Sequence, residues 1–341
     1  MQSASDLLMP PTPPNLVTLS EGEASRFWVT IDAEEDFDWA GPFSRTGHRL
    51  DSVPALADCQ HYFEQAGVCP IYLVDWPIVE DDRAVEILGN ALRGGRCEVG
   101  AQLHPWVTPP FEEEVNAHNS YTGNLPPELQ RAKMAALQRG IEDRFGVAPL
   151  VYRAGRYGLG HDTATMLAEL GFRCDTSVRS AFDYRPGHGP DYRNAPLQPW
   201  WVETDVQPIL EVPVTTVFGG LLGGKGRGLY HRLTRGGSHA GAALARSRLV
   251  ERIALTPEGI PAERACKAID IALARRLPIL NFSFHSPSLQ PGNTPYVRDE
   301  ADLVRFYRWW DIVLDHLKRR GVEPTSAAEI LAMADQKRGA H

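Results

Sequence analysis

FWVTIDAEEDFDW, residues 27–39, joins an apolar run to a burst of carboxylates. Residues 27–31 are aromatic and β-branched, a composition typical of a buried strand. Because side chains alternate along an extended chain, Asp32, Glu34 and Asp36 would lie on one side and could converge on a metal ion or a reacting water. The same pattern fits a solvated acidic loop that caps a strand. The rest of the chain decides between these two interpretations.

The composition is that of a globular protein with one large domain or two smaller ones. The 341 residues are 43% hydrophobic and 23% charged, which is enough for a sizeable core. The net charge of -8 argues against nucleic acid or an anionic membrane surface as the main partner and favours a neutral or small one. The five cysteines are scattered singly, so the sequence predicts buried free thiols and neither a disulfide framework nor a CxxC zinc site.

The first 25 residues contain four prolines and are predicted to form an extended arm. They lack a basic start followed by a long apolar core, so they do not have the pattern of a secretory signal. No stretch approaches the roughly 18 apolar residues of a membrane span. With unpaired thiols, the expected location is the cytoplasm.

From residue 26 to residue 336, short apolar runs alternate with helical patterns and predict a single domain. The strand-helix order implies a parallel sheet, and the number of strands predicts a distorted (β/α) barrel of about seven parallel strands. An open doubly wound sheet is the alternative, although no GxGxxG or Walker pattern opens a helix after the first strand. The predicted strands lie near 27–32, 70–75, 97–103, 149–153, 172–175, 209–214 and 279–284, and the predicted helices near 52–66, 82–93, 127–145, 161–170, 261–275 and 299–319.

Two stretches interrupt this alternation. Residues 105–126 form a proline-punctuated loop of the kind that shapes the mouth of a barrel. Residues 218–259 begin FGGLLGGKGRG and are interpreted as a flexible insertion. A phosphate cradle is the alternative, but no Ser or Thr follows Lys225 and the spacing differs from that of a P-loop.

Polar residues follow most of the predicted strands directly. In parallel barrels the carboxyl ends of the strands carry the chemistry, so these side chains are predicted to meet in one pocket. A carboxylate can accept a proton from water, a histidine can donate one to a leaving amine, and a mixed set can hold a divalent metal. An arginine beside Asp32 would keep that carboxylate charged and oriented. The six strand-end residues are Asp32, Asp75, His104, Arg153, Asp175 and His285.

Aromatic residues cluster on the same predicted loops. Aromatic faces near a polar rim suit sugar rings, and they equally suit ordinary packing. The aromatic residues are Trp39, Trp76, Trp106, Phe111 and Tyr157. Together with Asp75, three of them, Trp39, Trp106 and Tyr157, are the candidate substrate-binding residues.

Five short motifs, each at a predicted strand end, resemble in order those of the polysaccharide deacetylase family, the NodB-homology domain of carbohydrate esterase family 4. The His-Pro-Trp version of the second motif resembles a divergent subgroup associated with cell-surface glycans. The motifs are VTIDAEED, EVGAQLHPW, VYRAGRYG, CDTS and FSFHSPSL, and the resemblance runs from about Phe27 to Leu289.

The resemblance implies a carbohydrate-metabolism enzyme on a TIM-like barrel that hydrolyses the N-acetyl group of an amino sugar with a divalent metal, often zinc. It implies that Asp32 is the general base, Arg153 its partner, His285 the general acid and Asp175 the residue that orients this histidine. Glu34, His104 and Gln102 are the implied metal ligands.

The sequence departs from the family at the metal site. Ala33 replaces the usual second aspartate, and Gln102 and Trp106 stand at the usual histidine positions. We therefore predict weak metal binding or none. Three functions stay open: removal of an N-acetyl group from a cell-surface glycan or glycolipid precursor, hydrolysis of another non-peptide C–N amide bond, and glycan binding by an inactive barrel. The sequence leaves the sugar and the oligomeric state open.

Overall fold

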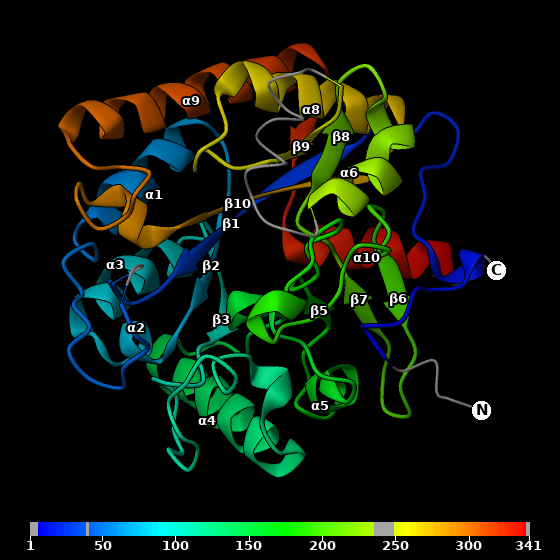
Figure 1. Cartoon of the computed structure of the whole chain (residues 1–341). Coiled ribbons are helices and arrows are strands. Elements are labelled where there is room, and N and C mark those ends of the chain that lie inside the picture. The colour runs from blue at the N-terminus through cyan, green and yellow to red at the C-terminus, as the bar shows by residue number, and fades with distance from the viewer. Residues whose placement is uncertain (1–5, 39–40, 235–248, 339–341) are drawn as a thin grey trace.

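The computed structural model describes residues 6–38, 41–234 and 249–338, and in them a curled, mostly parallel sheet forms a half-barrel (Figure 1). Seven neighbouring strands run parallel in the order β10-β1-β2-β3-β4-β5-β7, and β6 pairs antiparallel with β7 at one edge. The predicted α/β fold with about seven parallel strands is confirmed. These strands are β1 (Arg26–Ala33), β2 (Ile71–Val74), β3 (Glu98–Leu103), β4 (Val151–Ala154), β5 (Cys174–Asp175), β6 (Trp200–Val202), β7 (Ile209–Glu211) and β10 (Ile279–His285).

Helices cover the outer face of the sheet because the outward side chains of the strands are apolar. Phe27, Val29 and Ile31 of β1 belong to the large core between strands and helices. Most of the predicted helices appear within a few residues of their expected bounds, whereas α2 and α10 were not predicted. The outer helices are α1 (Ala55–Gln65), α2 (Trp76–Glu80), α3 (Asp82–Arg93), α4 (Pro127–Phe145), α5 (Thr163–Glu169), α8 (Ala262–Ala274) and α9 (Glu300–Arg319).

The inner face of the sheet changes from apolar to polar along the strands. Near the amino ends, Trp28, Ile71 and Val151 form a second buried cluster, which α10 (Ala327–Arg338) covers with Ile330. Farther along the strands come inner polar residues such as Thr30, Asn281 and Ser283, which are also buried. Alternation therefore places apolar residues at the closed end of the barrel and polar residues toward its carboxyl ends.

The gap between β7 and β10 is bridged by the chain that leads into and out of a two-stranded hairpin. The hairpin consists of β8 (Thr216–Gly219) and β9 (Glu251–Ala254), which pair antiparallel. The backbone N–H of Thr215 donates to the carbonyl of Asn281 (3.2 Å), and that of Ser283 donates to the carbonyl of Leu255 (3.2 Å). Both contacts connect the hairpin to β10.

The stretch predicted as a flexible insertion, 218–259, contains most of this hairpin and the helix α6 (Arg227–Thr234); its residues 235–248 lie outside the described residues. The part of the amino-terminal arm that the structure describes packs on the barrel. Leu16 bridges to Trp200 of β6, and Leu7 is buried.

All five cysteines are free, and Cys59, Cys97 and Cys174 are buried, as expected. None of the helices in the described ranges has the length and apolar content needed to cross a bilayer.

Candidate active site

A pocket of about 470 Å³ opens at the carboxyl ends of the strands and collects most of the predicted site residues. Such a volume suits a small molecule. Asp75 and Asp175 are not among the described residues that line it, and Trp39 lies outside the described residues. The predicted site residues that line the pocket are Asp32, Glu34, Gln102, His104, Trp106, Arg153, Tyr157 and His285.

Asp32 lies at the bottom of this pocket, next to the buried guanidinium of Arg153. The Nη1 atom of Arg153 donates to Asp32 Oδ1 and to Ser283 Oγ (2.9 Å). Its Nη2 donates to Thr30 Oγ1 (2.8 Å), and its Nε donates to the carbonyl of Thr176 (3.1 Å). A buried ion pair is tolerated only when its remaining donors and acceptors are satisfied. The predicted partnership of Arg153 with Asp32 is therefore present, and it leaves Asp32 Oδ2 facing the pocket.

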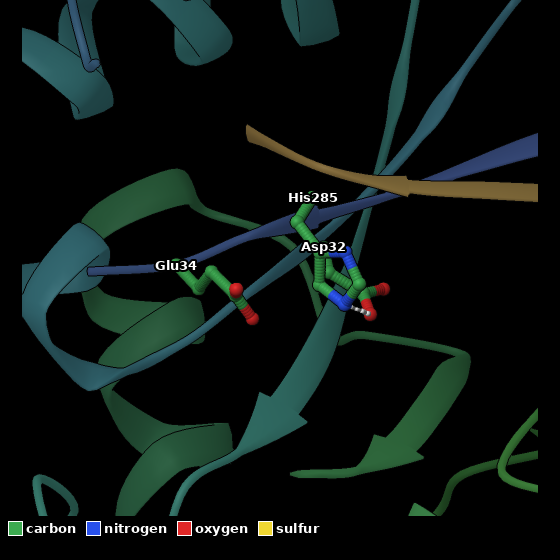
Figure 2. A group of neighbouring side chains, drawn as sticks. All are labelled: Asp32, Glu34 and His285. Carbon is green, nitrogen blue, oxygen red and sulfur yellow. Dashed lines mark ion pairs between the residues drawn. The ribbon is translucent and has the colours of Figure 1, made fainter. Parts of the chain in front are cut away.

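His285 ends β10 beside Asp32, because the two residues are register partners on adjacent strands. Its Nε2 lies 3.7 Å from Asp32 Oδ2, and Figure 2 shows the imidazole beside this carboxylate with Glu34 next to them. Nδ1 of His285 lies 2.7 Å from Glu258 Oε2, and the backbone N–H of His285 donates to Glu258 Oε1 (3.1 Å). Glu258 also accepts a hydrogen bond from Ser288 (2.6 Å).

These contacts correct the role predicted for Asp175. Its carboxylate accepts hydrogen bonds from the hydroxyl (2.7 Å) and backbone N–H (3.0 Å) of Ser177, so the orienting role that the resemblance implied for Asp175 is wrong. The inner neighbour Cys174 belongs to the apolar cluster inside the barrel, and alternation turns Asp175 to the opposite face. Glu258 makes the contacts that orient His285.

The environment of His285 favours its protonated form. Burial opposes the positive charge, but Glu258, together with Glu34 and Asp32, raises the pKa of His285 to about 10. Burial likewise opposes the negative charge of Glu258, yet His285 and the hydrogen bonds to that carboxylate lower its pKa. His285 is therefore a proton donor at neutral pH, held in place by an anionic partner.

Glu34 is the second carboxylate of the pocket and has a different environment from Asp32. Its side chain is buried, and burial raises its pKa to about 8. Gln102 Nε2 donates to Glu34 Oε2 (3.0 Å). Within the described chain, neither Glu34 Oε1 nor Gln102 Oε1 has a hydrogen-bond partner. Buried acceptors of this kind call for a ligand, a water or a cation.

His104 also lines the pocket, and its Nδ1 faces a second pair of buried carboxylates, Glu35 and Asp75. Its Nδ1 lies 2.9 Å from Glu35 Oε2 and 3.7 Å from Asp75 Oδ2, and its ring stacks on Trp106, with centroids 4.4 Å apart. Trp106 Nε1 donates to Glu35 Oε1 (2.8 Å). Gly155 makes room for the imidazole, since a Cβ there would lie 2.3 Å from His104 Cδ2.

The prediction that Asp75 binds substrate is wrong. Asp75 is fully buried and caps α2, where its Oδ1 accepts the backbone N–H of Ile78 (3.0 Å). Its Oδ2 accepts the backbone N–H of Glu35 (3.0 Å). Asp75 therefore supports the loop that carries Glu35 and does not reach the pocket.

Within the described ranges, two groups of carboxylates and imidazoles could hold a metal ion, and they differ in how well they fit one. In the group Glu35, Asp75 and His104, both carboxylates already accept hydrogen bonds from backbone or indole N–H groups. In the group Asp32, Glu34 and His285, the ligand atoms lie within 4.8 Å of one another and Glu34 Oε1 has no described partner.

The group around Glu34, at the carboxyl end of β1, fits a cation better than the group around Glu35. Glu34 offers an oxygen without a described partner, and His104 would complete the set with its imidazole, because His285 is protonated at neutral pH. Nε2 of His104 lies 3.5 Å from Glu34 Oε2 while Glu35 faces its Nδ1, the arrangement usual for a ligating histidine.

Sequence reasoning missed Glu35 and Glu258 as functional residues. Glu258 shows the strand-end signal, because it follows β9 closely, but it lies within the stretch interpreted as an insertion. Alternation placed Asp36 with Asp32 and Glu34, yet β1 ends at Ala33, and Asp36 Oδ2 accepts the backbone N–H of Ser52 instead (3.0 Å).

No protein-family model and no curated protein sequence matches this chain. Solved structures resemble it at low sequence identity. Puue allantoinase is 13% identical, with a TM-score of 0.49 over 92% of this chain and 91% of that one. A polysaccharide deacetylase from Bacillus cereus is 12% identical, with a TM-score of 0.40 over 89% and 94%. A GH57-type branching enzyme from Pyrococcus horikoshii is 11% identical, with a TM-score of 0.49 over 90% and 70%.

Proposed function

We propose that this protein is a hydrolase that removes an N-acetyl group from an amino sugar of a cell-surface glycan or glycolipid precursor. The observation that carries the proposal is the pair formed by Asp32 and His285, whose Oδ2 and Nε2 atoms lie 3.7 Å apart in the pocket. Each member has its own buried partner, Arg153 for Asp32 and Glu258 for His285. A single bound group can therefore contact a base and an acid together.

Amide hydrolysis gives each member of the pair one proton to move. Asp32 Oδ2 accepts a proton from the water that attacks the acetyl carbon, and Nε2 of protonated His285 donates one to the departing nitrogen. The C–N bond breaks, and acetate and a free amine leave. Arg153 keeps the Asp32 carboxylate oriented, and Glu258 stabilises the imidazolium. A divalent cation, when bound, would supply Lewis-acid polarisation of the acetyl oxygen. Glu34 and His104 would hold it, so that Asp32 Oδ2 stays available as the base.

The pocket walls support a sugar as the substrate. Besides Trp106 and Tyr157, the lining includes Tyr121, Tyr184 and Tyr296. Aromatic faces with polar groups between them suit the alternating apolar and hydroxyl surfaces of a pyranose ring.

The test is acetate release by the purified protein from N-acetylglucosamine oligomers and other N-acetylated sugars. Each reaction is run after chelation and after addition of zinc, cobalt or nickel. Release from a sugar amide supports the proposal. Turnover of non-sugar amides alone would replace it with the broader amide hydrolase. Tight sugar binding without any release would contradict hydrolysis and leave a glycan-binding barrel.

A further inference from the structure

Two arginines line the wall of the pocket without a carboxylate partner among the residues that the structure describes. Arg156 follows β4 and Arg179 follows β5, and both contact the pocket. Among the described residues neither makes an ion pair with an acid, in contrast to Arg153, which is paired with Asp32. The chain has a net charge of -8, so two cations left unpaired beside a binding pocket call for an explanation.

Aromatic rings hold both guanidinium groups by their faces. Arg179 lies over Phe182, with its Cζ 4.1 Å from the ring centroid, and 5.3 Å from the centroid of Tyr157. Arg156 lies over Tyr121 at 4.1 Å. Stacking of this kind orients a guanidinium and leaves the N–H groups at its edge available.

The edges of these guanidinium groups retain donor capacity. Nη1 of Arg179 donates only a long hydrogen bond to the hydroxyl of Tyr184 (3.5 Å), and its buried Nε has no partner within the described ranges. Nη1 of Arg156 donates to Ser120 Oγ. Each guanidinium carries five N–H donors. Arg156 is half-buried, and this burial lowers the pKa of its guanidinium.

The backbone of the two loops is strained where it presents these side chains. Arg156 and the next residue, Tyr157, have left-handed φ angles of 55° and 62°, and Ala181, two residues after Arg179, has a φ of 71°. Left-handed conformations of residues other than glycine cost free energy and cluster at binding and active sites.

We propose that Arg156 and Arg179 bind an oxyanion, a carboxylate or phosphate group, on the substrate. The inference rests on the proposed function and narrows its substrate to an N-acetylated amino sugar that carries an acidic substituent. The carboxylate of Asp32 repels an anion, whereas the arginine edges match its oxygens. The substrate therefore binds with its charge at the arginines and its acetamido group at Asp32 and His285. This replaces the neutral partner that the net charge suggested.

The test compares three ligands that differ in one substituent: N-acetylglucosamine, its 6-phosphate and its uronic acid. Calorimetry on full-length protein carrying Asp32→Asn, which prevents turnover, measures their binding. We expect one anionic sugar to bind about 10- to 100-fold more tightly than the neutral one, the range of one or two charge-assisted hydrogen bonds. Whichever anion gains affinity identifies the group as a phosphate or a carboxylate.

Arg179→Gln and Arg156→Gln should each reduce this preference, measured as the ratio of the affinities for the anionic and the neutral sugar. Arg252→Gln is the matched control. Arg252 also stacks on Phe182, at 3.4 Å, but its Nη1 donates to the carbonyl of Ala181 (3.0 Å) and it does not line the pocket. Thermal melts confirm that each variant is folded. A glutamine variant that is not folded is replaced by lysine at the same position, which keeps the charge.

Equal affinity for all three sugars, or a preference that survives both glutamine substitutions, would overturn the anion site. Acetate release from the same three sugars is then measured with the wild-type protein. A preference without release would overturn deacetylation and still support the anion site. Release without a preference would support deacetylation and overturn the anion site.

Discussion

Glu258 should set the pH range in which His285 can act as an acid, and Glu258→Gln tests this directly. The glutamine keeps the size of the side chain and an oxygen that can accept the hydrogen bonds from the His285 backbone N–H and from Ser288. It removes the negative charge that lies 2.7 Å from Nδ1 of His285. The change therefore removes the charge of Glu258 together with the acceptor that faces Nδ1 of His285.

The size of the effect follows from the pKa of His285, which the surrounding carboxylates raise to about 10 against the burial of the ring. Losing the Glu258 charge lowers that pKa, and each unit of lowering reduces the protonated fraction by up to tenfold at a pH above both pKa values. At pH 6 the ring is protonated in both proteins. We expect kcat/KM of the variant to match wild type at pH 6 and to fall increasingly behind it above pH 8.

The assay is a pH profile of acetate release from pH 5 to 11, combined with an NMR titration of His285 that does not depend on turnover. Glu251→Gln is a suitable control, because Glu251 lies on β9 and pairs with Arg264 away from His285 (2.8 Å). A loss by the same factor at every pH, with an unchanged titration of His285, would refute the electrostatic role of Glu258.

Three further predictions follow from the buried site. Burial raises the pKa of Glu34 to about 8. The folded state therefore keeps a proton that the unfolded chain releases near the usual pKa of a glutamate. The free energy of unfolding should fall by roughly 3–5 kcal/mol between about pH 4.5 and pH 8. Chemical denaturation of Glu34→Gln at pH 5 and pH 8 should show a flatter dependence, and an identical slope would contradict this. Calorimetry should show zinc, cobalt and nickel binding more weakly than about 1 μM and strengthening from pH 6 to pH 8 as Glu34 loses its proton; submicromolar binding abolished by His104→Ala would show that the site is stronger than its ligands suggest. Gly155→Ala, with its Cβ 2.3 Å from His104 and 2.6 Å from the carbonyl of Leu103, should cost about 1–3 kcal/mol in thermal melts, whereas Gly228→Ala, with nothing within 4 Å, should cost less. Equal melting temperatures of the two glycine variants would count against the predicted crowding at His104.

Much of the sheet could be predicted because local patterns determine it. The helices at 82–93 and 127–145 have the predicted bounds. Helical periodicity and the signals that start and end a helix depend on residues that are close in sequence, so they can be recognised without the structure. All seven predicted strands appear as well. The convergence of Asp32 and His285 followed from the rule that the carboxyl ends of parallel strands meet at one rim.

Other parts of the site depend on contacts between distant segments, which no local pattern encodes. Glu258 meets His285 across 27 residues, and it does so because the β8–β9 hairpin bridges the gap in the barrel. Asp175 received its orienting role from the resemblance of CDTS to a family motif at a predicted strand end. Since β5 has only two residues, the sequence offered too short an alternation to show that Asp175 faces away from the pocket.

The most direct test of the central claim is acetate release by the Asp32→Asn protein beside wild type on the best N-acetylated sugar. The asparagine keeps the size of Asp32 and an oxygen that can accept a hydrogen bond from Arg153, but it cannot act as a base. We predict a loss of roughly 10²–10⁴-fold in turnover, with the circular dichroism spectrum and melting transition of a folded protein. Near-normal acetate release by folded Asp32→Asn protein would contradict the assignment of Asp32 as the base.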